Sequence, residues 1–451
     1  MVTAINWIKQ YFFKPVHLAP LVVFRIAFGL LMFASIIRFM VKGWVYQMYI
    51  QPKFFFPYYG FEWVKPFSAT GMYLVFVVLA IVSLMIAAGL FYRFAILSFF
   101  ILFTYVELID KTNYLNHYYF ISIISFLLIF LPANRYFSLD VFRNQAIRVT
   151  HVSNYFVLII KCQVFIVYFF AGVAKINPDW LIQAQPLKIW LPAHSQMPVI
   201  GTLLAQEWVA YLFSWFGCLY DLAIPIFLFI PALVRPAYFF VIAFHLATSL
   251  FFNIGMFPYI MIVLTFIFFS EQFHLDLIRK IKSFLNLPAT EVGFRAYTPS
   301  PLPIKAIAFV LGIHFFIQML APFRYLLYKG NLFWTEQGYR FSWRVMLMEK
   351  AGTAFFYMRD RATGKEIEID NRDHLTYMQE KMMATQPDMM VDYAKFLKAE
   401  YEKKGFKNPI IRAQSYVTIN GSGSREFIDP TVDLSNENNS FLANKNWVKS
   451  Y

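Results

Sequence analysis

Long apolar runs, repeated through the first 321 residues, constrain the fold of this chain more than any other feature. Hydrophobic residues make up 59% of the sequence and charged residues only 15%. An α-helix of about 20 apolar residues crosses the hydrocarbon core of a bilayer. Because runs near that length recur, we predict a polytopic α-helical membrane protein with nine spans. The predicted spans are residues 18–41, 72–92, 94–109, 117–132, 153–174, 209–231, 236–252, 256–270 and 304–321.

The sequence changes character after residue 321. Charged residues, glycine and asparagine are then spread evenly, as in a water-soluble protein. We therefore predict two domains, a transmembrane helical catalytic domain over residues 1–321 and a soluble, β-containing α+β domain over residues 322–451. In the second domain, residues 421–424 predict a hairpin turn between strands at 411–418 and 425–428, not a phosphate-binding loop.

The positive charges of the chain lie mainly in short loops. The formal net charge is +14, but much of the excess falls between apolar runs, where lysine and arginine orient membrane helices. One set of alternate loops holds more of them than the other, so we predict a cytoplasmic N-terminus. Nine spans then place residues 322–451 outside, on the same face as the loops around His117 and Lys175. We expect no nucleic-acid partner.

The cysteines and histidines give little support to a metal site. Cys162 and Cys218 are the only cysteines, and both fall in predicted spans. They are either two small buried hydrophobes or a disulfide between neighbouring helices. The eight histidines are scattered, and the chain has no CxxC or HExxH motif. We therefore predict a site without a metal.

Lys175 ends an apolar run and is the first candidate catalytic residue. The run that contains Tyr168 stops at this lysine, and Asp179 and Trp180 follow a short turn. An ionisable side chain so close to hydrocarbon is costly and is by default functional. Desolvation favours the neutral amine, which can act as a base near neutral pH. The alternative is that Lys175 only extends its ammonium group to the membrane interface.

A second polar cluster lies at the outer end of the fourth predicted span. It contains Asn116 and His117 within residues 110–119. Tyrosine and histidine are common in the aromatic belt of a membrane interface, which is one interpretation. The other is that Asn116 and His117 donate hydrogen bonds to an oxyanion beside Lys175, in a site of low dielectric constant.

Three charged or polar residues interrupt other predicted spans. They are Arg25 in the first span, Asp221 in the sixth and His245 in the seventh. Each is either part of a site or a structural partner of another. A buried Asp221 paired with Arg25 or His245 would be such a structural pair.

Six groups of residues, in a fixed order from the membrane part into the soluble part, carry a resemblance to a known family. They are residues 110–112 with 116–118, residues 167–175 with 179–180, residues 244–245 with 254–257, residues 338–343, residues 363–364, and residues 427–430 with 432–433. The chain resembles the vitamin K-dependent gamma-glutamyl carboxylases in a bacterial form. Its membrane part resembles the horizontally transferred transmembrane (HTTM) domain family.

The resemblance implies a reaction in two coupled halves, without a metal. Reduced vitamin K, a hydroquinone, is deprotonated and oxygenated by O2, and an alkoxide formed from it removes a proton from the gamma carbon of a peptidyl glutamate. CO2 then adds to the carbanion, and vitamin K epoxide is the second product. The implied partners are a glutamate-containing peptide or protein, membrane lipid and quinol. The implied location is a bacterial inner membrane.

The resemblance also implies roles for individual residues. Lys175 matches the lysine that acts as the initiating base, and Ala174 stands where animal members have a second lysine. His117 matches a histidine that stabilises or protonates oxyanion intermediates, with Asn116 beside it. The residues that we expect to support the site are Tyr168, Asp179, Trp180, Asp221, His245 and Arg25.

The aromatic segment 333–343 follows the ninth predicted span by about a dozen residues, so it must lie near the outer membrane surface. By itself this segment is typical of an interfacial aromatic belt. The resemblance instead implies that Tyr339 and Trp343 lie near the glutamate site. Arg340 lies between them and can add a cation for the substrate carboxylate, although animal members have a small residue at this position.

Three functions are compatible with the sequence. The first is a carboxylase that couples quinol epoxidation to glutamate carboxylation. The second is a quinol epoxidase that carboxylates no protein, and the third is a non-catalytic membrane module. The Lys175, His117 and Tyr339 regions argue against the third. The sequence does not distinguish phylloquinone from menaquinone, and it names neither the protein substrate nor the oligomeric state.

Overall fold

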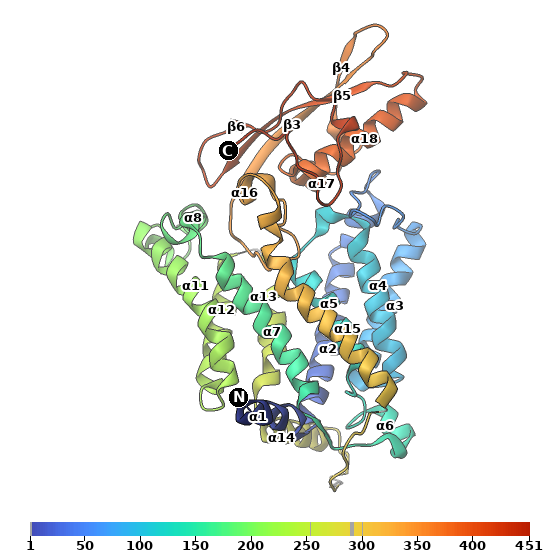
Figure 1. Cartoon of the computed structure of the whole chain (residues 1–451), viewed down its shortest axis with the longest axis vertical. Helices are drawn as coiled ribbons and strands as arrows, with labels where there is room; N and C mark the ends of the chain where they lie inside the picture. The colour runs from blue at the N-terminus through green and yellow to red at the C-terminus, as the bar shows by residue number, and fades with distance from the viewer. Residues whose placement is uncertain (1, 253, 289–292, 300) are drawn as a thin grey trace.

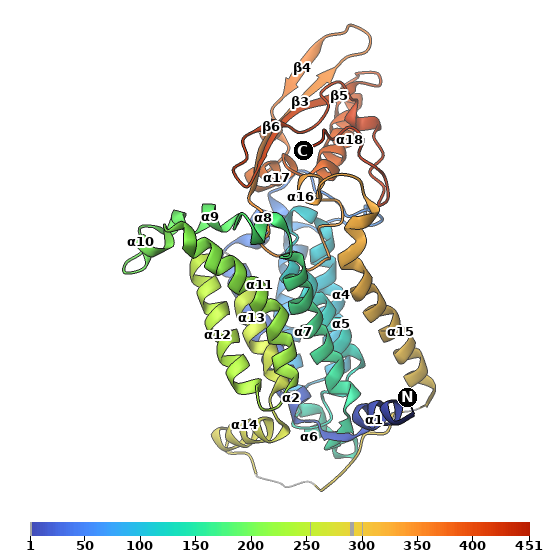
Figure 2. The same cartoon turned by 60° about the vertical axis from the view of Figure 1, so that its left-hand side comes forward.

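The computed structural model describes residues 2–252, 254–288, 293–299 and 301–451. Figure 1 shows a bundle of helices with a smaller part, which contains a β-sheet, at one end. The N-terminus lies at the opposite end of the bundle, beside α1 (Val2–Phe13) and α14 (Glu271–Phe284). Figure 2 shows both of these helices lying across that end of the bundle.

Seven helices in the described residues are long and apolar enough to cross a membrane. They are α2 (Ala19–Val41), α3 (Ala69–Ala88), α4 (Tyr92–Ile109), α7 (Tyr155–Ala174), α11 (Glu207–Phe229), α12 (Val234–Phe251) and the segment Ile304–Leu327, which joins α15 (Pro301–Leu320) to η6 (Ala321–Leu327). The number becomes eight if α13 (Phe257–Leu264) with η5 (Thr265–Phe268) and the following α14 form one bent span. The class of polytopic helical membrane protein is confirmed.

The prediction of nine full-length spans needs correction in two places. The run predicted at 117–132 forms α5 (Asn116–Phe130), which has 15 residues and is short for a membrane crossing. The run predicted at 256–270 is helical only to Phe268, and the chain then turns by 112° into α14. Helix α14 is amphipathic, so the chain leaves the bundle there and follows its end.

Glycines set the close contacts between neighbouring helices. A Cβ atom added to Gly29 of α2 would lie 2.5 Å from the backbone nitrogen of Ala87 on α3. One added to Gly172 of α7 would lie 2.8 Å from the side chain of Leu222 on α11. Small residues let helix backbones approach closely in membranes. The second contact matters for the site, because α7 and α11 carry two of its charged residues.

Shorter elements connect the spans and lie mainly at the two ends of the bundle. They are β1 (Pro15–His17), η1 (Tyr46–Ile50), η2 (Lys111–Asn113), α6 (Leu139–Arg143), η3 (Gln145–Ile147), β2 (His151–Ser153), α8 (Pro178–Leu181), α9 (Leu187–Trp190), η4 (Pro192–His194), α10 (Gly201–Leu204) and α16 (Leu332–Thr335). Strands β1 and β2 pair antiparallel and tie the chain before α2 to the chain before α7.

The C-terminal part is an antiparallel sheet with helices, as predicted for an α+β domain. The strand order is β4-β3-β5-β6. The elements of this part are β3 (Lys350–Arg359), β4 (Glu366–Ile369), η7 (Asn371–Asp373), α17 (Tyr377–Met383), α18 (Pro387–Lys403), β5 (Ile410–Ile419), β6 (Arg425–Glu426) and η8 (Leu434–Asn436). Along β5 the buried side chains alternate with less buried ones, so one face covers a core that includes Tyr393 and Leu397 of α18. The predicted hairpin is confirmed by the pairing of Val417 with Arg425.

Buried charged groups join the C-terminal part to the bundle. The ammonium group of Lys111, which is 4% exposed, lies 2.8 Å from a carboxylate oxygen of Asp388 and 2.5 Å from one of Asp392. Arg340 also binds Asp388, at 2.9 Å. Burial alone would raise the pKa of Asp388, but Arg340 and Lys111 outweigh it and hold that pKa well below its usual range. This network fixes α18 against the loop between α4 and α5.

We predict that the C-terminal part lies outside the cell and that the opposite end of the bundle is cytoplasmic. In a protein whose own cysteines are replaced by alanine, a cysteine at the exposed Ser424 should react with an impermeant maleimide in cells with a permeabilised outer membrane. A cysteine at the exposed Asn144, next to α6, should stay protected until the inner membrane is opened. The reverse labelling pattern would contradict this orientation.

Candidate active site

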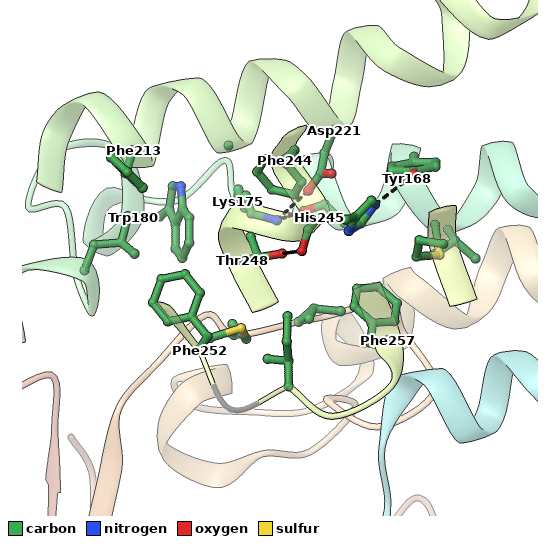
Figure 3. Close-up of a pocket in the computed structure, with 18 of the residues that line it drawn as sticks. Tyr168, Lys175, Trp180, Phe213, Asp221, Phe244, His245, Thr248, Phe252 and Phe257 are labelled. Atoms are coloured by element: carbon green, nitrogen blue, oxygen red, sulfur yellow. Dashed lines mark hydrogen bonds and ion pairs between the residues drawn. The ribbon is translucent and has the colours of Figure 1, made fainter. Parts of the chain in front are cut away.

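Lys175 and Asp221 form a buried ion pair between α7 and α11. The lysine Nζ donates a hydrogen bond of 2.6 Å to Oδ2 of Asp221, and the two residues are 6% and 5% exposed. Figure 3 shows both side chains at the wall of a pocket, with the lysine directed to the carboxylate. Lys175 therefore does not extend its charge to the membrane interface, and that alternative is wrong.

The chain after α7 folds back over this ion pair. The side chain of Asn177 caps α8 by accepting a hydrogen bond from the backbone N–H of Trp180. The indole N–H of Trp180 then donates to the carbonyl of Ser214 on α11, at 2.9 Å. As a result, the Trp180 ring lies 5.4 Å from the Lys175 ammonium group, in a cation–π contact. A Cβ atom at Gly217, one turn before Asp221, would lie 3.8 Å from the Trp180 ring and 4.0 Å from Cε of Lys175, so this position borders both groups.

The ion pair lines a chamber of about 90 Å³ that is otherwise almost entirely apolar and aromatic. Its walls include Tyr168, Trp180, Trp190, Phe213, Phe244, Phe252, Phe257 and Met261. Val345 and Met346 complete the lining, and they belong to the segment that leads from the bundle into the sheet. Both parts of the chain therefore form the chamber, as the labelled side chains of Figure 3 show for the helical side.

His245 and Tyr168 form a second polar pair in the chamber wall. The tyrosine hydroxyl lies 2.9 Å from Nε2 of His245, and Figure 3 shows this contact beside the Lys175–Asp221 pair. The other ring nitrogen, Nδ1, is buried and has no hydrogen-bond partner within the described residues. A buried polar atom without a partner is costly. Nδ1 is thus available to a polar group of a ligand.

Asn116 and His117 lie close to the chamber but do not line it. The ring centroid of His117 is 6.1 Å from that of Phe257, which is a wall residue, and Phe257 in turn lies 6.0 Å from His245. His117 is therefore one aromatic layer behind the wall. Asn116 donates a hydrogen bond of 2.7 Å to the carbonyl of Arg344, so it holds the segment that ends in Val345 and Met346.

Two other predicted residues have structural contacts. Oδ2 of Asp179 accepts a hydrogen bond of 3.1 Å from Asn420 at the end of β5, so it joins α8 to the sheet. Arg25 donates to the carbonyls of Ala133 and Phe137, just before α6, at the end of the bundle away from the sheet. The proposed pairing of Asp221 with Arg25 or His245 is therefore corrected, because Lys175 is its partner.

The residues predicted to bind glutamate lie between the two parts of the chain. Arg340 lines a cleft of about 520 Å³, together with residues of the loop before α3 and of α18. Trp343 is only 1% exposed, and its ring packs on Tyr119, with 5.1 Å between the centroids. Burial raises the pKa of the Tyr339 phenol, and its ring packs on Phe333 with 6.4 Å between the centroids. Arg340 thus faces the cleft, whereas Trp343 anchors the segment to α5.

Sequence reasoning missed several residues of the chamber. Thr248 follows His245 by three positions and therefore shares its helix face, a signal that the sequence did contain. Val345 and Met346 carry no such signal.

Cys162 and Cys218 are free thiols, so the disulfide alternative is wrong. In the described part of the chain no three His, Cys, Asp or Glu side chains gather as a metal site would require, and the expectation of no metal stays a prediction.

Two family models match this chain. The HTTM domain model matches residues 13–273. The model of the vitamin K-dependent gamma-carboxylase lumenal domain matches residues 304–451. The chain therefore belongs to the HTTM family, and the two matches together place it in the gamma-carboxylase-like family, as the resemblance predicted. No solved structure matched the chain.

Proposed function

We propose that this protein is a vitamin K-dependent gamma-glutamyl carboxylase that couples the epoxidation of reduced vitamin K by O2 to the carboxylation of peptidyl glutamate. The observation that carries the proposal is the Lys175–Asp221 pair, buried in the wall of an apolar chamber that both parts of the chain form. In this assignment Lys175 is the initiating base and Asp221 controls its charge.

The chamber suits a flat, apolar substrate with phenolic hydroxyl groups. Aromatic side chains, among them Trp180, Phe213 and Phe244, provide faces against which a hydroquinone ring can stack. The polar groups are few and fixed, as is usual for small-molecule sites. Nδ1 of His245 is buried and has no partner among the described residues, so it can contact one oxygen of the ring. Lys175 and Asp221, the charged pair of the wall, also line the chamber.

The ion pair lets a lysine act as a base without an isolated charge in an apolar space. The ammonium group of Lys175 donates its hydrogen bond to Asp221. If that proton moves to the carboxylate, both groups become neutral, and the free amine accepts a phenolic proton from the substrate. The substrate anion then lies beside the ammonium group, so charge appears only in pairs. An unpaired ammonium group at this depth would cost several kcal/mol.

The cleft beside Arg340 is the proposed entry of the glutamate-bearing chain. It lies between the bundle and the C-terminal part, so it is accessible from water. Arg340 lines the cleft, and Met346, six residues later, lines the chamber. One short segment therefore connects the proposed peptide site with the chamber that contains Lys175. A strong base made from a membrane-soluble quinol can meet a water-soluble peptide only at such a junction.

One contact favours the second candidate function, a quinol epoxidase that carboxylates no protein. Arg340 is already bound to Asp388, with 2.9 Å between nitrogen and oxygen, and it also contacts Gln386. A cation with its charge balanced in this way attracts a substrate carboxylate less strongly than a free one. Epoxidation alone needs only the chamber, and it would persist without a peptide site.

We predict that Lys175→Ala abolishes both products. Purified protein is incubated with reduced vitamin K, O2, labelled CO2 and a glutamate-rich peptide, and the epoxide and the fixed label are measured in one tube. The wild type should form both, and the variant neither, because the first proton transfer precedes every later step. Lys188→Ala is the matched control, since Lys188 pairs with Glu207 at the same end of the bundle but does not line the chamber.

Other results in this assay would contradict the proposal in distinct ways. Wild-type epoxide output from a correctly folded Lys175→Ala protein would refute the base assignment. Epoxide without fixed label from the wild-type protein, with several glutamate peptides, would support the quinol epoxidase instead. Neither product from the wild type would remove both functions.

We predict that Tyr339→Ala lowers peptide carboxylation while epoxidation stays near the wild-type rate. Tyr339 lies beside Arg340 in the segment between the cleft and the chamber, and its ring packs on Phe333, so its loss should disturb the peptide site first. Tyr416→Ala, at an exposed tyrosine on β5, is the control and should change neither activity. An equal fall in both products with Tyr339→Ala would place this residue in the quinol chamber. Trp343→Ala is a poorer test, because loss of a buried tryptophan costs about 3–5 kcal/mol of stability.

A further inference from the structure

A second large cavity opens at the end of the bundle away from the sheet. It has a volume of about 740 Å³ and lies between α7, the end of α11, the beginning of α12, the beginning of α14 and the chain after α1. Figure 1 shows α1 and α14 at this end, whereas α8, which directly follows the turn after Lys175, lies at the opposite end of the bundle. The proposed carboxylase reaction makes no use of this cavity.

Three cations line the cavity, and one carboxylate opposes them. The cations are Lys14, Lys161 and Arg235. The carboxylate is Glu271, whose Oε2 accepts the backbone N–H of His17 at 3.0 Å. Lys161 lies on α7, inside a membrane span, and within the described residues its ammonium group has no ion pair. The ammonium nitrogen lies 5.4 Å from the centroid of the Phe268 ring, in a cation–π contact.

An ammonium group inside a membrane span is expensive unless something balances its charge. Elsewhere in this protein buried lysines have partners, as Lys175 has Asp221 and Lys111 has Asp388. Lys161 is half-buried and instead shares a cavity with two exposed cations, Lys14 and Arg235, against the single carboxylate of Glu271. The lining of the cavity therefore carries an excess of positive charge, which favours an anionic ligand.

The ends of two helices add to this preference for an anion. Residues of the first turns of α12 and α14 line the cavity. The backbone N–H groups of a helix start carry a partial positive charge. At the start of α12 no side chain caps these groups, whereas Ser270 caps α14. These dipoles act on a ligand that the three cations already attract.

The rest of the lining is apolar and identifies the kind of anion. Leu228 and Phe229 of α11 and Phe268 of η5 form a hydrophobic side to the cavity. A free inorganic anion would make no use of this surface. An amphiphile would place its charged group among the cations and its chain along the aromatic rings. The cavity also lies where α11 ends and where α12 and the amphipathic helix α14 begin.

We propose that this cavity binds an anionic phospholipid, with the phosphate among Lys14, Lys161 and Arg235 and an acyl chain against Phe229 and Phe268. The phosphate of the lipid supplies the negative charge that pairs with Lys161. The lipid also joins α7 to α12 and to the amphipathic helix α14. Because each lysine near an anionic lipid contributes about 1 kcal/mol, loss of Lys161 should weaken binding about five-fold.

Native mass spectrometry of the full chain in detergent tests this proposal. Phosphatidylglycerol should bind to the wild type at a lower concentration than phosphatidylcholine, and Lys161→Ala should raise the required phosphatidylglycerol concentration about five-fold. Lys161→Arg keeps the charge and should bind like the wild type. Lys280→Ala is the matched control, because Lys280 is an exposed cation of α14 outside the cavity lining. If Lys161→Ala does not fold, Arg235→Ala at an exposed position replaces it.

Three outcomes would overturn the lipid assignment. The first is equal binding of phosphatidylcholine and phosphatidylglycerol. The second is an equal loss with Lys161→Ala and Lys280→Ala, which would indicate only a general attraction to the basic end of the bundle. The third is displacement of phosphatidylglycerol from the wild type by millimolar inorganic phosphate, which would show that the cavity recognises phosphate alone. None of these outcomes bears on the carboxylase assay, so the two proposals fail independently.

Discussion

The ion pair between Lys175 and Asp221 is the interaction on which the rest of the site depends. A lone ammonium group or carboxylate in this apolar chamber would be too costly to remain charged. Each residue of the pair neutralises the charge of the other. The pair also fixes the helices, because Lys175 ends α7 while Asp221 lies in the middle of α11. The close approach at Gly172 brings the two backbones near enough for a bond of 2.6 Å. The chamber is therefore built around a proton donor and acceptor in contact.

The C-terminal part completes this chamber, so its attachment has a chemical consequence. Lys111 is bound by two carboxylates of α18, and Asn116 holds the carbonyl of Arg344. These contacts place Val345 and Met346 in the chamber wall. The segment that leads into the sheet thereby forms part of the chamber wall, as the proposed reaction between a lipid-soluble and a water-soluble substrate would require. A closed chamber also excludes water, which would protonate a strong base before it reached its substrate.

The sequence predicted the elements well and their mutual contacts poorly. Apolar length and composition are local, so every predicted run proved to be helical, although α5 is short and the chain bends by 112° before α14. Lys175 was identified because an apolar run ended in a charge. Asp221 was also named as a supporting residue, but its pairing with Lys175 was not predicted, because the side of α11 that faces α7 depends on packing between segments 46 residues apart. For the same reason Arg340 was expected to be a free cation, whereas Asp388 balances it. The catalytic roles of Lys175 and His117 stay predictions.

Chemical rescue of Lys175→Ala measures most directly whether Lys175 supplies the base. The variant leaves a space where the lysine chain was, next to Asp221 in a chamber of about 90 Å³. Small primary amines should restore epoxide formation, more strongly when the amine is more basic and less strongly when it is bulkier. Asp221→Asn/Lys175→Ala should respond less, because the carboxylate that positions the amine is gone. Equal stimulation by strong and weak bases, or no rescue by any amine in a correctly folded variant, would contradict the assignment of Lys175 as the initiating base.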